Sequence, residues 1–313
     1  MVKYGIIQRV QPERKGRMNR NERRSLRRIT MSRFSIGIIL DSFRKPFPEA
    51  LKLTRDLGAQ GVQVYATRGE MAPENLVGQK RRDFLKLVKD NGLVISALCG
   101  DLGHGFGDPE RNPELLRRSK LILDLAKELE TDIVTTHIGV VPMDAGHPVY
   151  HIMQDACGEL AAYADSLNAH FAIETGPEPS SVLRSFLDGL HSTGVAVNLD
   201  PANLVMVAGD DPVQAVHNLA PYIVHTHAKD GKMLRRTDPQ AIYGTTNHGT
   251  NKAEGEGPAY IELPLGQGNV PFDKYLAALT EEGYHGFLTI EREVGENPAA
   301  DIALAVNFLK ERI

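Results

Sequence analysis

Four short apolar segments of the sequence each end in a side chain that can bind a metal ion or exchange a proton. These side chains are Glu174, Asp200, His227 and Glu291. One such carboxylate could simply cap a helix or pair with a lysine, but four in equivalent positions favour a shared site. Three carboxylates and one imidazole suit Mn²⁺, Mg²⁺ or Co²⁺, and Zn²⁺ is a less favoured alternative. The residues therefore predict one bound divalent metal ion.

The segments that carry these residues belong to a regular alternation of strands and helices. Strands are expected at 34–40, 61–65, 93–98, 132–137, 169–174, 195–200, 222–227 and 286–291, with a helical segment after each. Eight such pairs in about 280 residues predict a single (β/α)8 TIM barrel, an α/β fold whose strand ends converge on one face. No GxGxxG motif follows the first strand, which argues against a doubly wound sheet that binds a dinucleotide.

Charge is distributed unevenly along the chain. Residues 1–33 hold eleven Lys and Arg against two Asp and Glu, a net +9, and because the whole chain carries −4 the remainder carries −13. We expect residues 1–32 to form a basic, disordered extension and residues 33–313 to form the catalytic barrel domain. A nucleic-acid arm or a targeting peptide is the alternative for the extension. The acidic remainder argues against nucleic acid as a partner of the barrel.

Membrane and disulfide signals are missing from the sequence. No apolar run reaches the roughly 20 residues that cross a bilayer, so no membrane partner is expected. The two cysteines, Cys99 and Cys157, show no CxxC spacing. This usage fits a reducing compartment, and we expect a cytoplasmic protein.

Several sequence motifs resemble those of the xylose isomerase-like TIM barrel superfamily, and within it the sugar phosphate isomerase and epimerase branch. The motifs are Ala172-Ile-Glu-Thr-Gly-Pro-Glu178, Asn198-Leu-Asp-Pro-Ala-Asn203, His225-Thr-His-Ala-Lys-Asp230, Pro264-Leu-Gly-Gln-Gly268 and Thr289-Ile-Glu-Arg-Glu293. The resemblance runs from Phe34 to the C-terminus. It implies one divalent metal held by the four strand-end residues. It also implies that Glu174 and Glu291 exchange protons with a substrate carbon through a metal-stabilised enediolate.

The resemblance leaves the substrate class broad and departs from one branch in detail. It implies an isomerase or epimerase of carbohydrate metabolism that acts on a small keto-sugar, a polyol or a sugar phosphate. Ketose epimerases of this superfamily carry a His where this chain has Asn203, and a Glu where Lys229 and Asp230 follow the metal-binding His. The sequence therefore does not support assignment to the ketohexose epimerases.

Weaker candidates surround the four principal residues. We expect His137, His104, Glu178, Asn203 and Lys229 to contact the substrate, although a structural role is the alternative for each. We expect His225 to face the helices rather than the mouth of the barrel. The segment 231–270 reads as a long structureless loop, which is typical of a lid or a subunit contact.

Two other functions remain open from the sequence. An inosose-dehydratase-like lyase would share the first proton transfer and then expel a hydroxyl group. A non-catalytic sugar-binding barrel would keep the cavity without the chemistry, because a fold alone does not establish catalysis. The oligomeric state is also open, with a homo-oligomer as one alternative.

Overall fold

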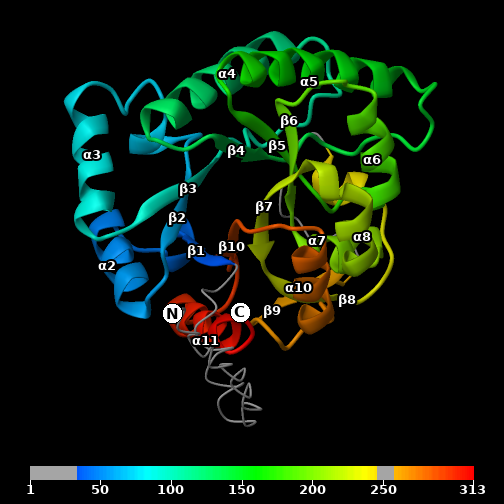
Figure 1. Cartoon of the computed structure of the whole chain (residues 1–313). Coiled ribbons are helices and arrows are strands. Elements are labelled where there is room, and N and C mark those ends of the chain that lie inside the picture. The colour runs from blue at the N-terminus through cyan, green and yellow to red at the C-terminus, as the bar shows by residue number, and fades with distance from the viewer. Residues whose placement is uncertain (1–33, 245–256) are drawn as a thin grey trace, which may run out of the picture. The chain divides into compact units, whose positions relative to one another are not determined.

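The computed structural model of the chain describes residues 34–244 and 257–313. Eight parallel strands close into a barrel in the order β1-β10-β7-β6-β5-β4-β3-β2 (Figure 1). The strands are β1 (Ser35–Ile39), β2 (Gly61–Tyr65), β3 (Val94–Cys99), β4 (Ile133–Thr136), β5 (His170–Glu174), β6 (Val195–Leu199), β7 (Ile223–Ala228) and β10 (Phe287–Ile290). The predicted TIM barrel is confirmed. The extension predicted at 1–32 lies outside the described residues.

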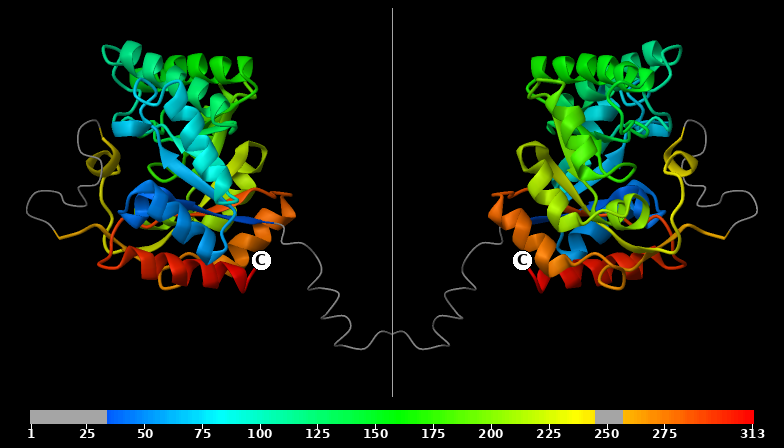
Figure 2. Two further views of the ribbon diagram at one scale, coloured as in Figure 1. Left: turned by 90° about the vertical axis from the view of Figure 1, so that its left-hand side faces the viewer. Right: turned by 90° about the vertical axis from the view of Figure 1, so that its right-hand side faces the viewer.

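A helix follows each barrel strand and covers its outer face (Figures 1 and 2). The long helices are α2 (Phe47–Leu57), α3 (Gln79–Asp90), α4 (Asn112–Glu128), α5 (Pro148–Ser166), α6 (Ser180–Asp188), α8 (Pro212–Leu219), α10 (Phe272–Glu281) and α11 (Pro298–Lys310). Proline in the first turn starts α4, α5, α8 and α11, where its missing N–H costs no hydrogen bond. Helix α4 buries Leu115, Ile122 and Ala126, the spacing of one helix face.

The segment 231–270 is not structureless, which corrects the expectation from sequence. It contains part of β8 (Asp230–Met233), helix α9 (Gln240–Tyr243) and β9 (Tyr260–Leu263), and β8 and β9 pair antiparallel. Alternation along β9 buries Glu262 and leaves Ile261 exposed. In Figure 2, α9 lies at one end of the barrel, outside its strands. His248 and Glu254, which also belong to this segment, lie outside the described residues.

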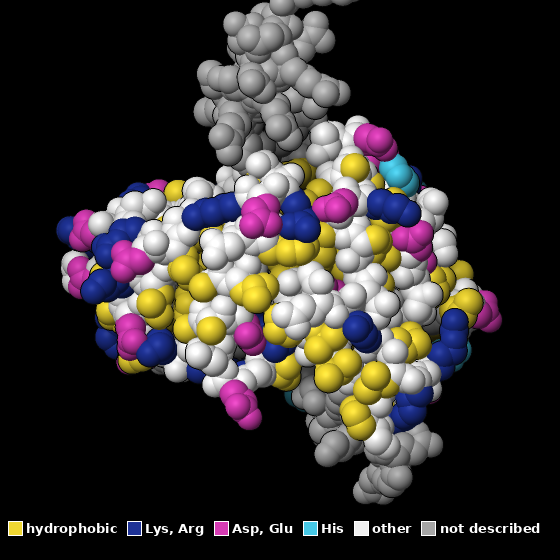
Figure 3. All heavy atoms as spheres, turned by 90° about the horizontal axis from the view of Figure 1, so that it is seen from below, with side chains coloured by type: hydrophobic (Ala, Val, Ile, Leu, Met, Phe, Trp, Pro, Cys, Tyr) yellow, Lys and Arg dark blue, Asp and Glu magenta, His cyan; other side chains and the backbone are white. Residues whose placement is uncertain are grey.

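The surface mixes charges of both signs. Figure 3 shows Lys and Arg side chains interspersed with Asp and Glu on the face seen from below. Local pairs contribute to this pattern, as where the Nε of Arg312 lies 3.0 Å from Asp273 Oδ1. A nucleic-acid backbone would require a continuous basic surface, which the described side chains of this face do not form. None of the described helices is long and apolar enough to cross a membrane.

Candidate metal centre

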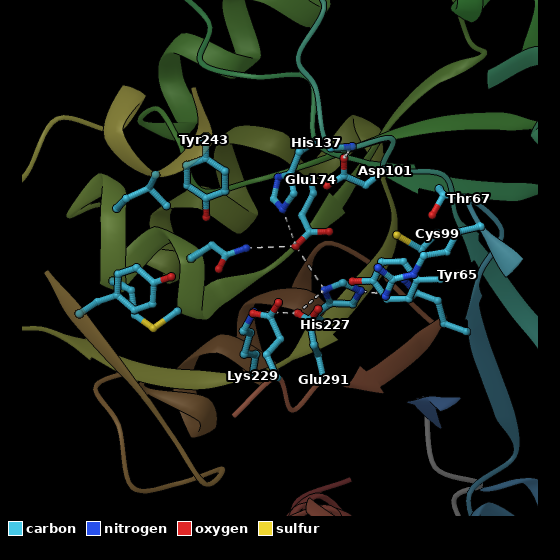
Figure 4. A pocket seen from close by; sticks show the side chains of 18 residues that line it. Tyr65, Thr67, Cys99, Asp101, His137, Glu174, His227, Lys229, Tyr243 and Glu291 are labelled. Carbon is cyan, nitrogen blue, oxygen red and sulfur yellow. Dashed lines mark hydrogen bonds and ion pairs between the residues drawn. The ribbon is translucent and has the colours of Figure 1, made fainter. Parts of the chain in front are cut away.

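The four strand-end residues meet at the carboxyl ends of adjacent strands. Glu174 is the last residue of β5, Asp200 follows β6, His227 lies near the end of β7 and Glu291 follows β10. One ligand atom from each side chain lies within 4.8 Å of all the others, and all four residues are buried. The barrel produces this cluster because parallel strands present their carboxyl ends on one face. Figure 4 shows His227 between Glu174 and Glu291.

The ligand atoms of this cluster face one another. The Nδ1 atom of His227 lies 3.3 Å from Glu291 Oε2, 3.4 Å from Asp200 Oδ2 and 3.5 Å from Glu174 Oε1. Within the described part of the chain, Asp200 Oδ2 accepts no hydrogen bond, whereas Glu291 Oε2 has the Lys229 ammonium 3.0 Å away. Buried carboxylate oxygens without a donor are costly unless a cation neutralises them. The donor set therefore fits a divalent cation that prefers oxygen and imidazole nitrogen.

The pKa values of the cluster also show that its carboxylates are stabilised by neighbouring positive charge. Burial alone would raise the pKa of Glu174, but His137 and His227 hold it below its ordinary value. Burial would likewise raise the pKa of Glu291, yet the ammonium of Lys229 and the ring of His227 lower it. Conversely, the carboxylates of Glu174 and Glu291 outweigh burial and hold the pKa of His227 well above its usual range. Both glutamates are therefore ionised at neutral pH and able to accept a proton.

Amide side chains hold the cluster in place. The Nδ2 atom of Asn198 donates to Glu174 Oε2 at 3.0 Å, and the Nδ2 atom of Asn203 donates to Glu174 Oε1 at 3.0 Å. Asp200 Oδ1 accepts from the backbone N–H of Ala202 and of Asn203, and so caps the short helix α7 (Pro201–Asn203). Amide donors thus orient both oxygens of Glu174, and backbone donors orient Asp200 through Oδ1, which leaves Asp200 Oδ2 for a ligand.

A cavity of about 240 Å³ opens beside the cluster and is lined by Glu174, His227 and Glu291. Three of the weaker sequence candidates, His137, Asn203 and Lys229, also line it. The His137 ring lies 4.9 Å from that of Tyr243, centroid to centroid. The Nζ atom of Lys229 lies 3.0 Å from Glu291 Oε2 and 2.5 Å from Glu293 Oε2. The volume lies below the roughly 300–1,000 Å³ of pockets for drug-sized ligands, so one small molecule fits.

Two other candidates do not line this cavity. His104 lies with Nδ1 3.2 Å from Arg111 Nη1. Glu178 is buried, and its Oε2 accepts the backbone N–H of Val141 at 3.1 Å. Burial raises the pKa of Glu178 to about 8. A substrate-binding role for either residue stays a prediction that this geometry does not support.

The cavity also contains residues that the sequence did not single out. They are Gln63 and Tyr65 of β2, Arg68, Asp101, Tyr243 of α9, Tyr260 of β9 and Glu293. The aromatic side chains come from segments far apart in the sequence, and no local pattern joins them. Gln63 carried a usable signal, because it is the polar residue within the otherwise apolar run Gly61–Tyr65.

The expectation that His225 faces the helices is wrong. Its Nδ1 lies 2.9 Å from Asn198 Oδ1 and its Nε2 2.9 Å from Thr289 Oγ1, and its ring lies 5.7 Å from that of His227. Residues two apart on a strand share a face, so His225 and His227 both point into the barrel. Burial lowers the pKa of His225 to about 3, which keeps its ring neutral.

Comparison with known proteins agrees with the fold. A model of the xylose isomerase-like TIM barrel family matches residues 51–312, most of the chain. The chain belongs to this family. The sequence match and the closed eight-stranded barrel agree on this membership.

Proteins that are similar to this chain differ in function. Fructoselysine 3-epimerase of Escherichia coli O157:H7 is 21% identical over 261 residues, covering 79% of this chain and 86% of the relative. A second curated relative is matched over only 38% of its length. A xylose isomerase domain protein of Planctomyces limnophilus superposes with a TM-score of 0.72 at 24% identity, covering 89% of this chain and 96% of that one. The probable 3-DHS dehydratase AsbF of Bacillus anthracis superposes with a TM-score of 0.68 at 18% identity, covering 90% and 100%.

Proposed function

We propose that this xylose isomerase-like barrel is a divalent-metal-dependent epimerase or isomerase of a small keto-sugar, polyol or sugar phosphate. One observation carries the proposal. Two ionised glutamates, Glu174 and Glu291, line one small cavity and share a buried cluster with Asp200 and His227, in which one ligand atom from each residue lies within 4.8 Å of the others. The relation to a fructoselysine 3-epimerase supports the same reaction class.

The positions of the two glutamates suit proton transfer on two faces of a carbon atom. Strands β6 and β7 separate β5 from β10 in the barrel, so Glu174 and Glu291 reach the cavity from different sides. One carboxylate removes the proton next to a carbonyl group, and the other delivers a proton to the opposite face. The configuration of that carbon is thereby inverted. His137 and Lys229 line the same cavity and are placed to hold substrate oxygens.

Metal chemistry is needed because carboxylates with a lowered pKa are weak bases. A divalent cation held by Glu174, Asp200, His227 and Glu291 would withdraw charge from substrate oxygens and so acidify the neighbouring C–H. We favour Mn²⁺, Mg²⁺ or Co²⁺ on the donor set. A cytoplasmic location and assembly into a homo-oligomer stay predictions.

A lyase is the second candidate, and Lys229 favours it. Its ammonium is buried, lines the cavity and lies 3.0 Å from Glu291 Oε2. A cation in this place can donate a proton to a departing hydroxyl after the first proton is removed. The structural likeness to a probable dehydratase is compatible with this alternative. Elimination and epimerisation share the first step, so the product distinguishes them.

The test is solvent isotope exchange. We expect Mn²⁺-loaded protein in D₂O to place deuterium in at least one member of a panel of ketoses, inososes and their phosphates. The variant Glu291→Gln should lose exchange by at least about 100-fold, the usual effect of removing a general base. The metal content of each preparation is measured, so that lost exchange is not mistaken for lost metal. Glu296→Gln, at an exposed position, is the matched control and should exchange like the wild type.

The product decides between the candidates. A recovered or epimerised sugar that carries deuterium supports the epimerase or isomerase. A dehydrated product supports the lyase. If no compound exchanges although the metal is stoichiometric, the protein is better described as a non-catalytic sugar-binding barrel and the proposal fails.

A further inference from the structure

A layer of buried polar side chains lies inside the barrel next to the metal cluster. Its members are Gln63 on β2, Thr135 on β4, Asn198 on β6, His225 on β7 and Thr289 on β10. They form hydrogen bonds to one another and to the cluster. In a barrel core, apolar side chains would fill this space at lower cost, since each buried polar group must find a partner. The layer therefore requires an explanation beyond packing.

Gln63 contacts the side of His227 that points away from the carboxylates. The Oε1 atom of Gln63 lies 3.1 Å from His227 Nε2, and the Nε2 atom of Gln63 donates to Thr135 Oγ1 at 3.1 Å. Thr135 is fully buried, and this bond orients the Gln63 amide. An amide oxygen can only accept a hydrogen bond, so the hydrogen of a neutral His227 ring resides on Nε2. The lone pair then resides on Nδ1, the atom that faces all three carboxylates.

Asn198 does not supply this function. Its Nδ2 atom lies 3.2 Å from His227 Nε2, but an amide N–H is a donor and cannot accept the imidazole hydrogen. That Nδ2 donates instead to Glu174 Oε2, while its Oδ1 faces His225 Nδ1. Among the described side chains near Nε2, Gln63 is the one that presents an oxygen.

We propose that Gln63 is a positioning residue for the metal centre: it fixes the tautomer and ring orientation of His227 so that Nδ1 can bind the cation. This inference rests on the proposed metal-dependent function. A histidine ligand commonly donates its other ring N–H to an acceptor that orients the ring and sets its tautomer. A neutral amide suits this cluster, because a carboxylate here would add a fourth negative charge beside three buried ones.

The test compares Mn²⁺ dissociation constants, measured by competition with a chromophoric chelator. Gln63→Leu removes the acceptor and should bind Mn²⁺ about 10–100-fold more weakly than the wild type. Gln63→Glu keeps an acceptor oxygen and should bind at least as tightly as the wild type. Ser96→Ala is the matched control, because Ser96 is buried on the neighbouring strand β3 and donates to Val62 O rather than to the cluster. Its Mn²⁺ affinity should stay within about twofold of the wild type.

Folding and binding are read separately in each variant. Urea unfolding of the chelator-treated proteins shows whether a variant is folded before its metal affinity is compared. If folded Gln63→Leu binds Mn²⁺ as tightly as the wild type, the inference is overturned. If Gln63→Leu does not fold, folded Gln63→Glu decides: wild-type or tighter affinity supports the role of the acceptor, and a loss of tenfold or more overturns it. Should wild-type protein bind no divalent metal at all, the proposed function fails first, and the two failures are thereby distinguished.

Discussion

At the scale of single residues, burial decides the protonation state of Glu178. The carboxyl is buried, and although the backbone N–H of Val141 partly offsets the loss of water, the pKa rises to about 8 from its ordinary value of 4.5. The folded protein therefore holds a proton that the unfolded chain releases between these two values. Folding stability must fall as pH rises through this window, since the folded state binds the additional proton.

We predict that Glu178→Gln removes this pH dependence. The Glu178 contribution to stability is fully present below pH 4.5 and is lost as pH rises through about 8. The slope is about 1.4 kcal/mol per pH unit. The Gln oxygen can still accept the Val141 N–H, so the stability of the variant relative to the wild type should increase steadily from pH 5 to pH 8.

Urea unfolding of both proteins at pH 5, 6, 7 and 8 measures the difference. Other titrating groups are common to the two proteins and cancel in the comparison. A constant difference across this range would show that Glu178 is ionised in the folded state, contrary to the prediction.

At the scale of elements, one carboxylate joins β8 to the loop that follows β9. Asp230 Oδ1 accepts the backbone N–H groups of Gly231 and Val270, and Oδ2 accepts those of Gly266 and Gly268, at 2.9–3.1 Å. A Cβ atom at Gly268 would collide with the Asp230 carboxylate, so only glycine fits there. This contact explains how the sequence Pro264-Leu-Gly-Gln-Gly268 is held against β8.

We predict that Asp230→Asn destabilises the protein by roughly 2–4 kcal/mol. In the wild type, the backbone N–H groups donate to charged carboxylate oxygens of Asp230. In the variant, the Nδ2 group of the asparagine would direct its two hydrogens toward such N–H donors, which would then lose their acceptor. Asp273→Asn is the control, because that exposed carboxylate pairs with Arg312 at the surface, and it should change stability by no more than about 0.5 kcal/mol. Urea unfolding at pH 7 measures both variants. Equal effects of the two substitutions would contradict the proposed importance of the Asp230 contact.

At the scale of the whole molecule, the barrel brings three carboxylates together at a buried position, and this arrangement lowers the stability of the fold. Strands β5, β6 and β10 each contribute one, and the Lys229 ammonium and His227 ring offset part of the charge. Mutual repulsion of buried charges opposes folding, and a bound cation would relieve it. Metal binding and folding should therefore be coupled.

We predict that Mn²⁺ at about 100 times its dissociation constant raises the free energy of unfolding of the wild type by about 2.7 kcal/mol. Asp200→Asn should lose most of this gain. After treatment with a chelator, however, the variant should be at least as stable as the wild type. Its Oδ1 can still cap α7, and an amide donor replaces Asp200 Oδ2, which accepts no hydrogen bond from the described residues.

Chemical denaturation measures the free energies of unfolding of the wild type and of Asp200→Asn, each with and without Mn²⁺. A chelator-treated Asp200→Asn protein that is clearly less stable than the wild type would indicate that the Asp200 charge is already compensated by the protein. The coupling of metal binding to folding would then have to be explained by other residues.

The sequence by itself determined the barrel and the residues at its strand ends. Alternating strands and helices are local patterns, and a closed parallel barrel brings every strand end to one face, so Glu174, Asp200, His227 and Glu291 had to be neighbours. The family match over residues 51–312 confirms the barrel.

Only the tertiary structure decided which other side chains meet these four. Gln63 reaches His227 across 164 positions of sequence, and Tyr243 and Tyr260 enter the cavity from a segment that reads as a loop. Glu178 follows a cluster residue closely in sequence, yet it packs against the backbone of Val141 instead. Side-chain neighbours of this kind depend on how distant elements pack and on which rotamer each residue adopts, and neither is encoded in local periodicity.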